Sequence, residues 1–325
     1  MTGKVKTEQF SEEDRAKITF LGRQGAEYVM AGDIKYVIPK RLDIDFIKYK
    51  MPIFQDDIFI ITPPKCGTTW TQEIVWLLLN NLEKPKKNQF YRIPFLEIQS
   101  IRPPPVPELE YPVEGTEQNE ANLKQFQTHS IQYVQELKRP RIIKTHLPLS
   151  LLPDNLVERC KVIFVTRNIK DMAVSYYYHH RLASNSYEFK EFAEAYRRGI
   201  VLQTPMIPMV LEAWNQRSHP NLLFNTYEDM KKDFRSTIDR LVKFLNVTLP
   251  EDKFRDLEER VSIESFRGDV LVNKTNEIPS GTGTFIRKGV VGDWKNHFDD
   301  GMNKEWDAWI EEQMKDTDFK MVYEL

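Results

Sequence analysis

Short apolar runs recur along the chain, and their length and composition predict the strands of one sheet. They are DIFIIT at 57–62, RIIKT at 141–145, KVIFVT at 161–166 and NLLFNT at 221–226. Each run is rich in Ile, Val, Leu or Phe and lacks regular polar alternation, which is typical of strands buried on both faces of a parallel sheet. We therefore expect these runs to form a parallel sheet at the centre of the fold.

Helical periodicity follows three of these runs. Apolar side chains recur at helical spacing across Thr68–Asn80, Lys170–Ala183 and Asp229–Leu245. Strands that alternate with amphipathic helices are typical of an α/β fold in which helices flank a central parallel sheet. A chain of 325 residues is within the range of one large α/β domain. We expect a single domain over residues 1–325, with residues 1–35 as an N-terminal extension.

Two long segments lack this pattern and predict excursions from the sheet. Residues 84–140 contain the run RPPPVP (102–107), which can continue neither a helix nor an inner strand, followed by a helical stretch near Glu120–Lys138. Residues 267–292 contain Pro279 and several glycines. Loops of this length inside a compact domain are often functional, for instance as lids. The alternative is two disordered surface loops.

Composition narrows the classes of function. The chain has 46 Lys and Arg against 48 Asp and Glu, a formal charge of -2, and a hydrophobic fraction of 41%. These values argue against a disordered chain and against a protein that coats nucleic acid. Two cysteines, Cys66 and Cys160, are too few for a disulfide framework, and no Cys/His cluster indicates zinc. A polar N-terminus, and no apolar stretch approaching about 20 residues, predict a cytoplasmic protein without a membrane partner.

The segment PPKCGTTW (63–70) lies between a predicted strand and a predicted helix. A glycine-containing turn that leads into a helix presents free backbone N–H groups and the positive end of the helix dipole, which suits a phosphate. Lys65 adds a cation, and Thr68 and Thr69 add hydroxyl donors. This P-loop-like arrangement differs from the Walker A pattern, in which the lysine follows the last glycine. An ordinary tight turn with a capping threonine is the alternative.

Further polar residues occur later in the chain at corresponding places. Arg167 follows the run at 161–166, and Ser175 lies on the next predicted helix. Arg287 and Lys288 directly precede Gly289. Guanidinium and ammonium groups beside a glycine could together bind a second anionic group. Taken singly, each is more simply explained as a solvated surface charge.

Five motifs in this chain resemble those of the cytosolic sulfotransferase family. They are PPKCGTTW (63–70), KTHLPL (144–149), TRNIKDMAVSYY (166–177), TYEDM (226–230) and FIRKGVVGDWKNHF (285–298). The resemblance extends from about Tyr36 to the C-terminus, and five motifs in the right order are far more specific than one. It implies a sulfotransferase that takes 3′-phosphoadenosine-5′-phosphosulfate (PAPS) as donor, releases 3′-phosphoadenosine-5′-phosphate (PAP) and requires no metal.

By position, the resemblance assigns most of the site to this donor. The residues expected to hold the 5′-phosphosulfate are Lys65, Cys66, Gly67, Thr68 and Thr69, with Cys66 where the family often has serine. Those expected to hold the 3′-phosphate are Arg167, Ser175, Arg287, Lys288 and Gly289. Trp70 and Tyr227 are expected to flank the adenine, since aromatic rings stack on it. The other expected nucleotide contacts are Val261, Ser262, Phe266, Phe285 and Ile286, with Val261 in place of a threonine and Ser262 the better hydroxyl donor.

His146 is the predicted catalytic base. An extended chain points Lys144 and His146 to the same side, and an imidazole with a pKa of about 6.5 can accept a proton at neutral pH. A lone histidine is more often structural, but the KTHLPL context favours catalysis here. The resemblance implies in-line sulfuryl transfer, in which Lys65, helped by Lys144, stabilises the leaving oxygen. In the family the serine at position 175 also holds this lysine back until an acceptor is bound.

The expected acceptor is a small lipophilic alcohol, phenol or amine. Phe95 falls at a substrate-facing position of the family, and His179, beside His180, is expected to line the same pocket. In the family, segments equivalent to 84–140 cover the acceptor and those equivalent to 267–292 cover the nucleotide. The first is longer here than in many relatives, which favours elongated hydrophobic acceptors. Some long-insert relatives use transient sulfation to dehydrate an allylic alcohol, so a sulfation-dependent dehydratase is an alternative.

Two other functions are alternatives to a sulfotransferase. One is a hydrophobic-ligand carrier with an inherited nucleotide pocket, against which the intact set of Lys65, Lys144 and His146 argues. The other is a small-molecule kinase, against which the absence of a Walker A pattern argues.

The dimer motif of the family, KxxxTVxxxE, is degraded at Lys295–Lys304. Asp299 and Asp300 replace its Thr-Val pair, and Lys304 replaces its glutamate. Adjacent carboxylates are unfavourable in a small self-pairing contact because the two copies repel each other. We expect this interface to be weakened or absent, which leaves a monomer or a weak, alternative dimer.

Overall fold

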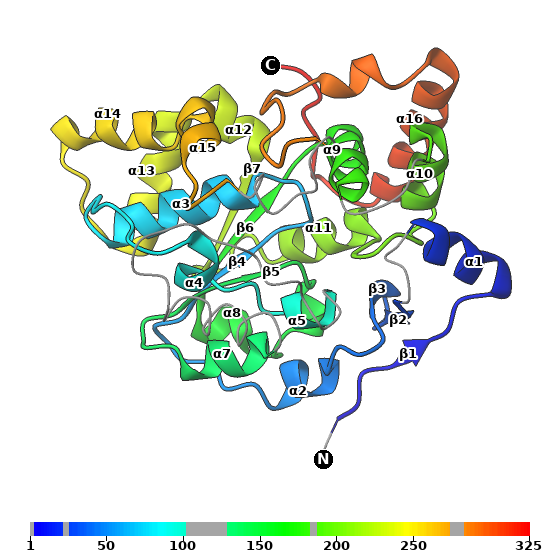
Figure 1. Cartoon of the computed structure of the whole chain (residues 1–325), viewed down its shortest axis with the longest axis horizontal. Helices are drawn as coiled ribbons and strands as arrows, with labels where there is room; N and C mark the ends of the chain where they lie inside the picture. The colour runs from blue at the N-terminus through cyan, green and yellow to red at the C-terminus, as the bar shows by residue number, and fades with distance from the viewer. Residues whose placement is uncertain (1–2, 22–25, 102–128, 183–186, 274–282) are drawn as a thin grey trace.

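A four-stranded parallel sheet lies at the centre of the molecule (Figure 1), and its strands coincide with the four apolar runs. The strands β5 (Ile142–Thr145), β4 (Ile58–Ile61), β6 (Lys161–Thr166) and β7 (Leu222–Thr226) are hydrogen-bonded in this order, and each neighbouring pair is parallel. The structure is a computed structural model that describes residues 3–21, 26–101, 129–182, 187–273 and 283–325. The predicted single α/β domain with a parallel sheet and flanking helices is confirmed.

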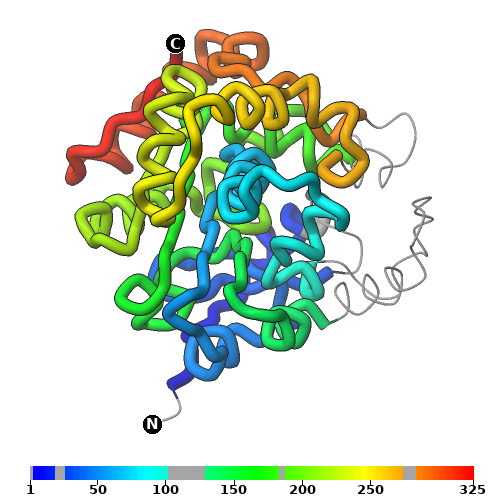
Figure 2. The backbone as a smooth tube through the Cα atoms, turned by 90° about the vertical axis from the view of Figure 1, so that its left-hand side faces the viewer, coloured from blue at the N-terminus to red at the C-terminus, as the bar shows by residue number. Residues whose placement is uncertain are grey.

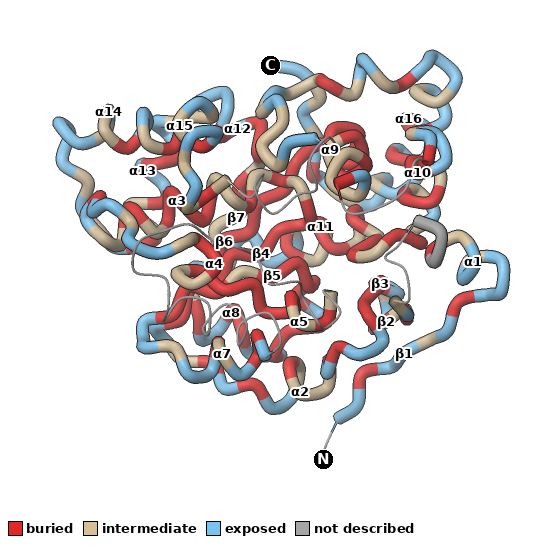
Figure 3. The backbone as a smooth tube through the Cα atoms, in the orientation of Figure 1, coloured by how far each residue is buried: buried red, intermediate tan, exposed pale blue. Residues whose placement is uncertain are grey.

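Both faces of the sheet are buried, as continuous apolar runs predict. Phe59 and Ile61 of β4 join one hydrophobic cluster, whereas Ile58 and Ile60 join another, because alternate side chains point to opposite faces. Helices α3 (Thr68–Leu79) and α13 (Phe234–Leu245) cover the second face, and α11 (Met206–Asn215) packs on the first. Figure 3 shows buried backbone concentrated along the strands and around α9 (Ile169–Arg181).

The stretch predicted as one helix over 229–245 consists of two helices. The first, α12 (Tyr227–Lys232), ends at Asp233, whose carboxylate accepts a hydrogen bond of 2.9 Å from the N–H of Ser236 and caps α13. A side chain that satisfies a free N–H group favours the start of a new helix at this point. The prediction of one helix was wrong because it followed apolar spacing alone.

Residues 1–35, expected as an extension, contribute to a second sheet. Strands β1 (Thr7–Glu8), β2 (Tyr28–Ala31) and β3 (Tyr36–Pro39) are antiparallel, and α1 (Glu12–Leu21) connects the first two in sequence. Tyr36 of β3 is completely buried, and its hydroxyl donates a hydrogen bond of 2.6 Å to the backbone oxygen of His146. The small sheet therefore supports the residue that follows β5.

The described parts of the excursion at 84–140 contain short helices. These are α4 (Gln89–Arg92), α5 (Ile98–Ile101) and α7 (Ser130–Glu136), of which α5 and α7 lie side by side (Figures 1 and 2). Helix α7 falls inside the helical stretch predicted near 120–138. The proline run lies outside the described residues, as do residues 274–282 of the second excursion.

The remaining elements complete the layers around the sheet. They are α2 (Ile44–Tyr49), η1 (Leu149–Leu151), α8 (Leu156–Arg159), α10 (Phe189–Arg197), α14 (Glu251–Arg260), α15 (Ile263–Gly268), η3 (Asp293–Asn296) and α16 (Asp300–Met314). At the degraded dimer motif, the carboxylate of Asp299 accepts a hydrogen bond of 2.7 Å from the N–H of Met302 and caps α16. None of the helices in the described ranges is long and apolar enough to cross a membrane.

Candidate active site

The turn between β4 and α3 has a backbone shape that suits a bound phosphate. Lys65 and Gly67 both have left-handed backbone, with φ of 74° and 87°. A Cβ atom at residue 67 would lie 2.8 Å from the ring of Tyr227, so glycine is required there for space as well as for conformation. Helix α3 begins at the next residue, which brings its positive end to the turn.

One cavity of about 680 Å³ brings the predicted site residues together. Those that line it are Lys65, Gly67, Thr68, Thr69, Trp70, Phe95, Lys144, His146, Arg167, Ser175, His179, Tyr227, Val261, Ser262, Phe266, Phe285, Ile286, Arg287, Lys288 and Gly289. Cys66 is the exception, because its buried sulfur lies 3.0 Å from that of Met172 in the core. Only the backbone of Cys66 is therefore available to a ligand in the cavity.

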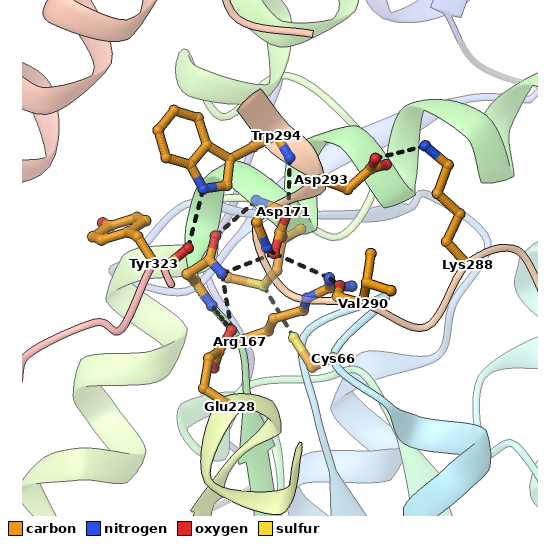
Figure 4. A network of polar contacts seen from close by, with 12 residues as sticks. Cys66, Arg167, Asp171, Glu228, Lys288, Val290, Asp293, Trp294 and Tyr323 are labelled. Atoms are coloured by element: carbon orange, nitrogen blue, oxygen red, sulfur yellow. Dashed lines mark hydrogen bonds and ion pairs between the residues drawn. The ribbon is translucent and has the colours of Figure 1, made fainter. Parts of the chain in front are cut away.

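Cations gather beside a buried carboxylate in one part of this cavity (Figure 4). Asp293 accepts a hydrogen bond from Arg287 at 2.5 Å. It accepts a second from Lys288 at 2.7 Å, which Figure 4 shows. Burial alone would raise the pKa of Asp293, but the hydrogen bonds from Lys288 and Arg287 outweigh it and lower that pKa below its usual range. The buried Nε atoms of Arg167 and Arg287 have no hydrogen-bond partner among the described residues. These two donors fit an anionic group such as the 3′-phosphate of PAPS.

Asp171, which was not among the predicted site residues, connects the segment after Arg287 to α9. Its carboxylate accepts hydrogen bonds from the backbone N–H groups of Gly292 at 2.8 Å and Trp294 at 2.9 Å, and lies 3.1 Å from Arg167 (Figure 4). Sequence reasoning missed this role because the two N–H partners lie 121 and 123 positions further along the chain.

Aromatic rings form another part of the cavity. Trp70 stacks on Phe234, with ring centroids 5.6 Å apart, and meets Tyr227 edge-on at 5.7 Å. Phe234 was expected only as an apolar position of a helix. The hydroxyl of Ser262 accepts a hydrogen bond of 3.1 Å from Ser265 and caps α15, so it already has a structural partner.

His146 follows β5 and is oriented by β4. Its Nδ1 atom lies 2.6 Å from the backbone oxygen of Thr62, and its ring meets the ring of Phe95 edge-on at 5.0 Å. The ammonium of Lys144 lies over the ring of Phe95, 3.6 Å from its centroid. The predicted base, its neighbouring lysine and the predicted acceptor-facing phenylalanine are thus in direct contact.

Glu97 was not predicted as a site residue, yet its carboxylate is hydrogen-bonded to the backbone of the predicted base, His146. It is 1% exposed and accepts hydrogen bonds from the N–H of His146 at 2.7 Å and from the hydroxyl of Thr145 at 2.8 Å. Burial raises the pKa of Glu97 to about 7, although the hydrogen bonds from His146 and Thr145 and the charge of Lys144 oppose the rise. A glutamate two residues after Phe95 carries no signal in the sequence that would point to this contact.

The part of the cavity that is expected to receive the acceptor combines apolar and polar groups. Its apolar lining includes Phe90, Phe95, Ile98, Ile101 and Leu202. Ser175, Tyr176, His179 and His180 contribute from α9. No hydrogen bond joins Ser175 to Lys65 within the described residues, and the holding role expected of Ser175 stays a prediction. The same residues contain no group of three His, Cys, Asp or Glu side chains that could hold a metal ion.

Comparison with known proteins identifies the class that this fold and site define. Residues 55–318 match the family model of the sulfotransferase domain. Human sulfotransferase 1E1 is 34% identical over 297 residues, which cover 86% of this chain and 93% of that protein. Luciferin sulfotransferase of Photinus pyralis is 30% identical over 90% of this chain and 81% of its own. The chain belongs to the sulfotransferase family, and it is a PAPS-dependent sulfotransferase.

Solved structures of similar proteins agree with this assignment. Retinol dehydratase, in a complex with retinol and PAP, has a TM-score of 0.89 and 31% identity, covering 99% of this chain and 100% of that one. Mouse sulfotransferase SULT7A1, complexed with PAP, has a TM-score of 0.66 and 22% identity, covers 88% of this chain and 94% of that one, and supports the fold.

Proposed function

We propose that this protein transfers the sulfuryl group of PAPS in line to the hydroxyl of a small lipophilic acceptor, with His146 as the base. The observation that carries the proposal is the 2.6 Å contact between Nδ1 of His146 and the backbone oxygen of Thr62. A carbonyl oxygen only accepts, so the neutral ring has its proton on Nδ1 and its basic lone pair on Nε2. His146 and Lys65 line one cavity, which allows the base and a leaving-group cation to serve the same transfer.

PAPS, when bound, supplies the sulfuryl group, and its 5′-phosphate oxygen is the leaving atom. Lys65, helped by Lys144, stabilises the negative charge that grows on this oxygen. The N–H groups at the start of α3 and the hydroxyls of Thr68 and Thr69 hold the 5′-phosphate. Nε2 of His146 takes the proton of the acceptor hydroxyl.

The 3′-phosphate is held by Arg167, Arg287 and Lys288. The two unpartnered Nε atoms of the arginines support this assignment, since a buried cationic donor without an acceptor is costly. Asp293 keeps Arg287 and Lys288 in place before the nucleotide arrives. The phosphate then shares these cations with Asp293. Asp171 holds the backbone that follows them, at Gly292 and Trp294.

A lipophilic acceptor is supported by the lining of the cavity near His146. Phe90, Phe95, Ile98 and Ile101 present apolar surface there, and burying such surface favours binding. The structures of retinol dehydratase, which hold retinol in one case and androsterone in another, support an acceptor of similar size and polarity.

Dehydration of an allylic alcohol is a second candidate, favoured by the similarity to retinol dehydratase over 99% of this chain. In such a reaction the C–O bond of the sulfate ester breaks and its electron pair leaves with the sulfate. The conjugated carbon skeleton then loses a proton, and a new double bond forms. The first step is the same sulfuryl transfer, so both candidates need the same base and cations.

Product analysis distinguishes the two candidates. The protein is incubated with PAPS and with retinol, a steroid alcohol or a simple phenol in turn, and PAP and the organic product are identified by mass spectrometry. A sulfate ester that accumulates supports the transferase. PAP, free sulfate and a dehydrated hydrocarbon together support the dehydratase. Tight binding of PAP without turnover of any acceptor would contradict both and favour a carrier.

A further inference from the structure

Lys65 is accompanied by an aromatic ring and not by a carboxylate. Its ammonium lies over the ring of Phe285, 5.1 Å from the centroid. In the part of the chain that the structure describes, no carboxylate lies within ion-pair distance of Lys65. Burial and the neighbouring charges of Arg287 and Arg167 lower the pKa of Lys65 to about 8. This environment weakens the preference of Lys65 for its charged form, and the neutral amine cannot stabilise a leaving oxygen.

Phe285 also contacts helix α9, through the ring of His179. The ring of His179 meets that of Phe285 edge-on at 6.0 Å. Two residues further, the guanidinium of Arg287 lies over the ring of Tyr178 at 4.8 Å. The segment from 285 to 294 thus runs along α9 toward its N-terminus, where Asp171 binds its backbone (Figure 4). The ring over Lys65 is therefore part of an anchored segment.

We propose that Phe285 is a positioning residue for catalysis, whose ring face holds the ammonium of Lys65 in place and favours its charged form before the donor binds. The inference rests on the role of Lys65 in the proposed function. The face of an aromatic ring attracts a cation but not a neutral amine, so the contact selects the protonated side chain. Burial and the charges of Arg287 and Arg167 both disfavour the ammonium, and this attraction opposes both effects.

In any test, the ionisation of Lys65 must be distinguished from the ionisation of other groups near it. They are Cys66 in the same turn, Lys144 in β5, His146 after β5, Arg167 after β6, His179 on α9, Tyr227 on α12, and Arg287 and Lys288 on the anchored segment. Burial raises the pKa of Cys66 and of Tyr227 above their ordinary values, so neither loses its proton near pH 8. Ionisation of Cys66 or Tyr227 therefore does not determine the basic limb of a plot of kcat/KM against pH.

The test compares Phe285→Leu with Phe285→Trp. The kcat/KM for PAPS is measured against pH with a saturating, non-ionising alcohol, because this ratio reports ionisations of the enzyme before PAPS binds. Phe285→Leu should move the basic limb down by about 0.5–1 pH unit, the size expected from loss of one cation–π contact. Phe285→Trp, which retains an aromatic face, should leave the limb at or above its wild-type position. Thermal unfolding checks each variant, and Phe285→Met replaces the leucine variant if the latter does not fold.

Three outcomes decide between the explanations. A limb that falls in Phe285→Leu but not in Phe285→Trp supports the proposal. A limb that stays in place in Phe285→Leu, or falls equally in both variants, overturns it. Lys65→Met, measured in parallel, should lower turnover by about 100-fold or more. Near wild-type turnover of Lys65→Met would instead overturn the leaving-group role of Lys65 in the proposed function.

Discussion

The Nδ1 atom of His146 lies 2.6 Å from the backbone oxygen of Thr62, so the residue after β4 orients the residue after β5. The contact follows from the strand register, in which Ile61 lies opposite Thr145. A shift by one residue would turn the side chains of β5 to the other face of the sheet and move the imidazole away. The pairing of two buried strands therefore also determines which nitrogen of the imidazole is basic.

Replacing His146 by alanine should separate catalysis from nucleotide binding. His146→Ala removes the proton acceptor, and turnover should fall by about 10²–10⁴-fold. The cations and the turn that hold PAP are unchanged, so its dissociation constant by calorimetry should stay within about threefold, less than 1 kcal/mol. Near wild-type turnover would refute the assignment of the base. A large loss of PAP affinity would mean that His146 acts through the fold of the site.

The turn at Gly67 offers a test with a matched control. In Gly67→Ala the new Cβ would lie 2.8 Å from the ring of Tyr227 on a backbone with φ of 87°. Strain of this kind costs about 1–3 kcal/mol, so PAP affinity should fall about tenfold or more. Gly268→Ala is the control, because no atom lies within 4 Å of its new Cβ. Equal effects of the two substitutions on PAP binding would contradict the explanation.

Asp171 should matter for PAP binding although it is not expected to touch the nucleotide. Asp171→Asn removes the charge that accepts the N–H groups of Gly292 and Trp294, and hydrogen bonds to charged groups contribute about 1.5–3 kcal/mol. PAP affinity should fall about 10–100-fold by calorimetry.

A control for this substitution lies on α16. Asp307→Asn removes the charge of one partner of Lys170, a buried residue of α9, and the side chain of Asp307 is 54% exposed. Lys170 keeps its hydrogen bond of 2.6 Å to the side-chain oxygen of Asn303, and the exposed carboxylate of Asp307 is screened by solvent, so PAP affinity should remain near wild type. The same PAP affinity in Asp171→Asn and wild type would show that the anchored segment holds its position without this carboxylate.

Local patterns in the sequence predicted the strands and the glycine-containing turn between β4 and α3 because both depend on neighbouring residues. The four apolar runs became the four strands, and the turn between β4 and α3 has the backbone that its glycine indicated. Glu97 and Asp171 are different, since each accepts hydrogen bonds from the backbone N–H groups of distant residues, and every residue type except proline carries such a group. Such contacts exist only after the chain has folded, so residue type and spacing could not reveal them.

The oligomeric state tests the interpretation of the degraded dimer motif. Asp299 caps α16 through Met302, so its carboxylate already serves the helix and would bring negative charge to a self-pairing contact. Light scattering at micromolar concentration should give the monomer mass of 38.5 kDa or a dimer insensitive to this segment. A stable dimer that is lost on mutation of Lys295–Lys304 would refute the prediction.

Glu97 predicts a pH dependence of stability. Because its pKa is raised from the ordinary value of 4.5 to about 7, the folded protein binds its proton more tightly than the unfolded chain does. The stabilisation is complete below about pH 4.5 and is lost as the pH rises through about 7, a change of roughly 3 kcal/mol. Glu97→Gln is neutral at every pH and should lack this term.

Urea unfolding from pH 4.5 to 8 measures the contribution of Glu97 as the difference in unfolding free energy between wild type and Glu97→Gln. The contributions of the other titrating groups cancel in this difference. The unfolding free energy of wild type minus that of Glu97→Gln should fall between about pH 5 and 7 and level off above it. Glu311→Gln, at an exposed position of α16, serves as the control and should give a nearly constant difference. A constant difference for Glu97→Gln as well would mean that this carboxylate stays ionised beneath His146, held by the N–H of that residue and the hydroxyl of Thr145.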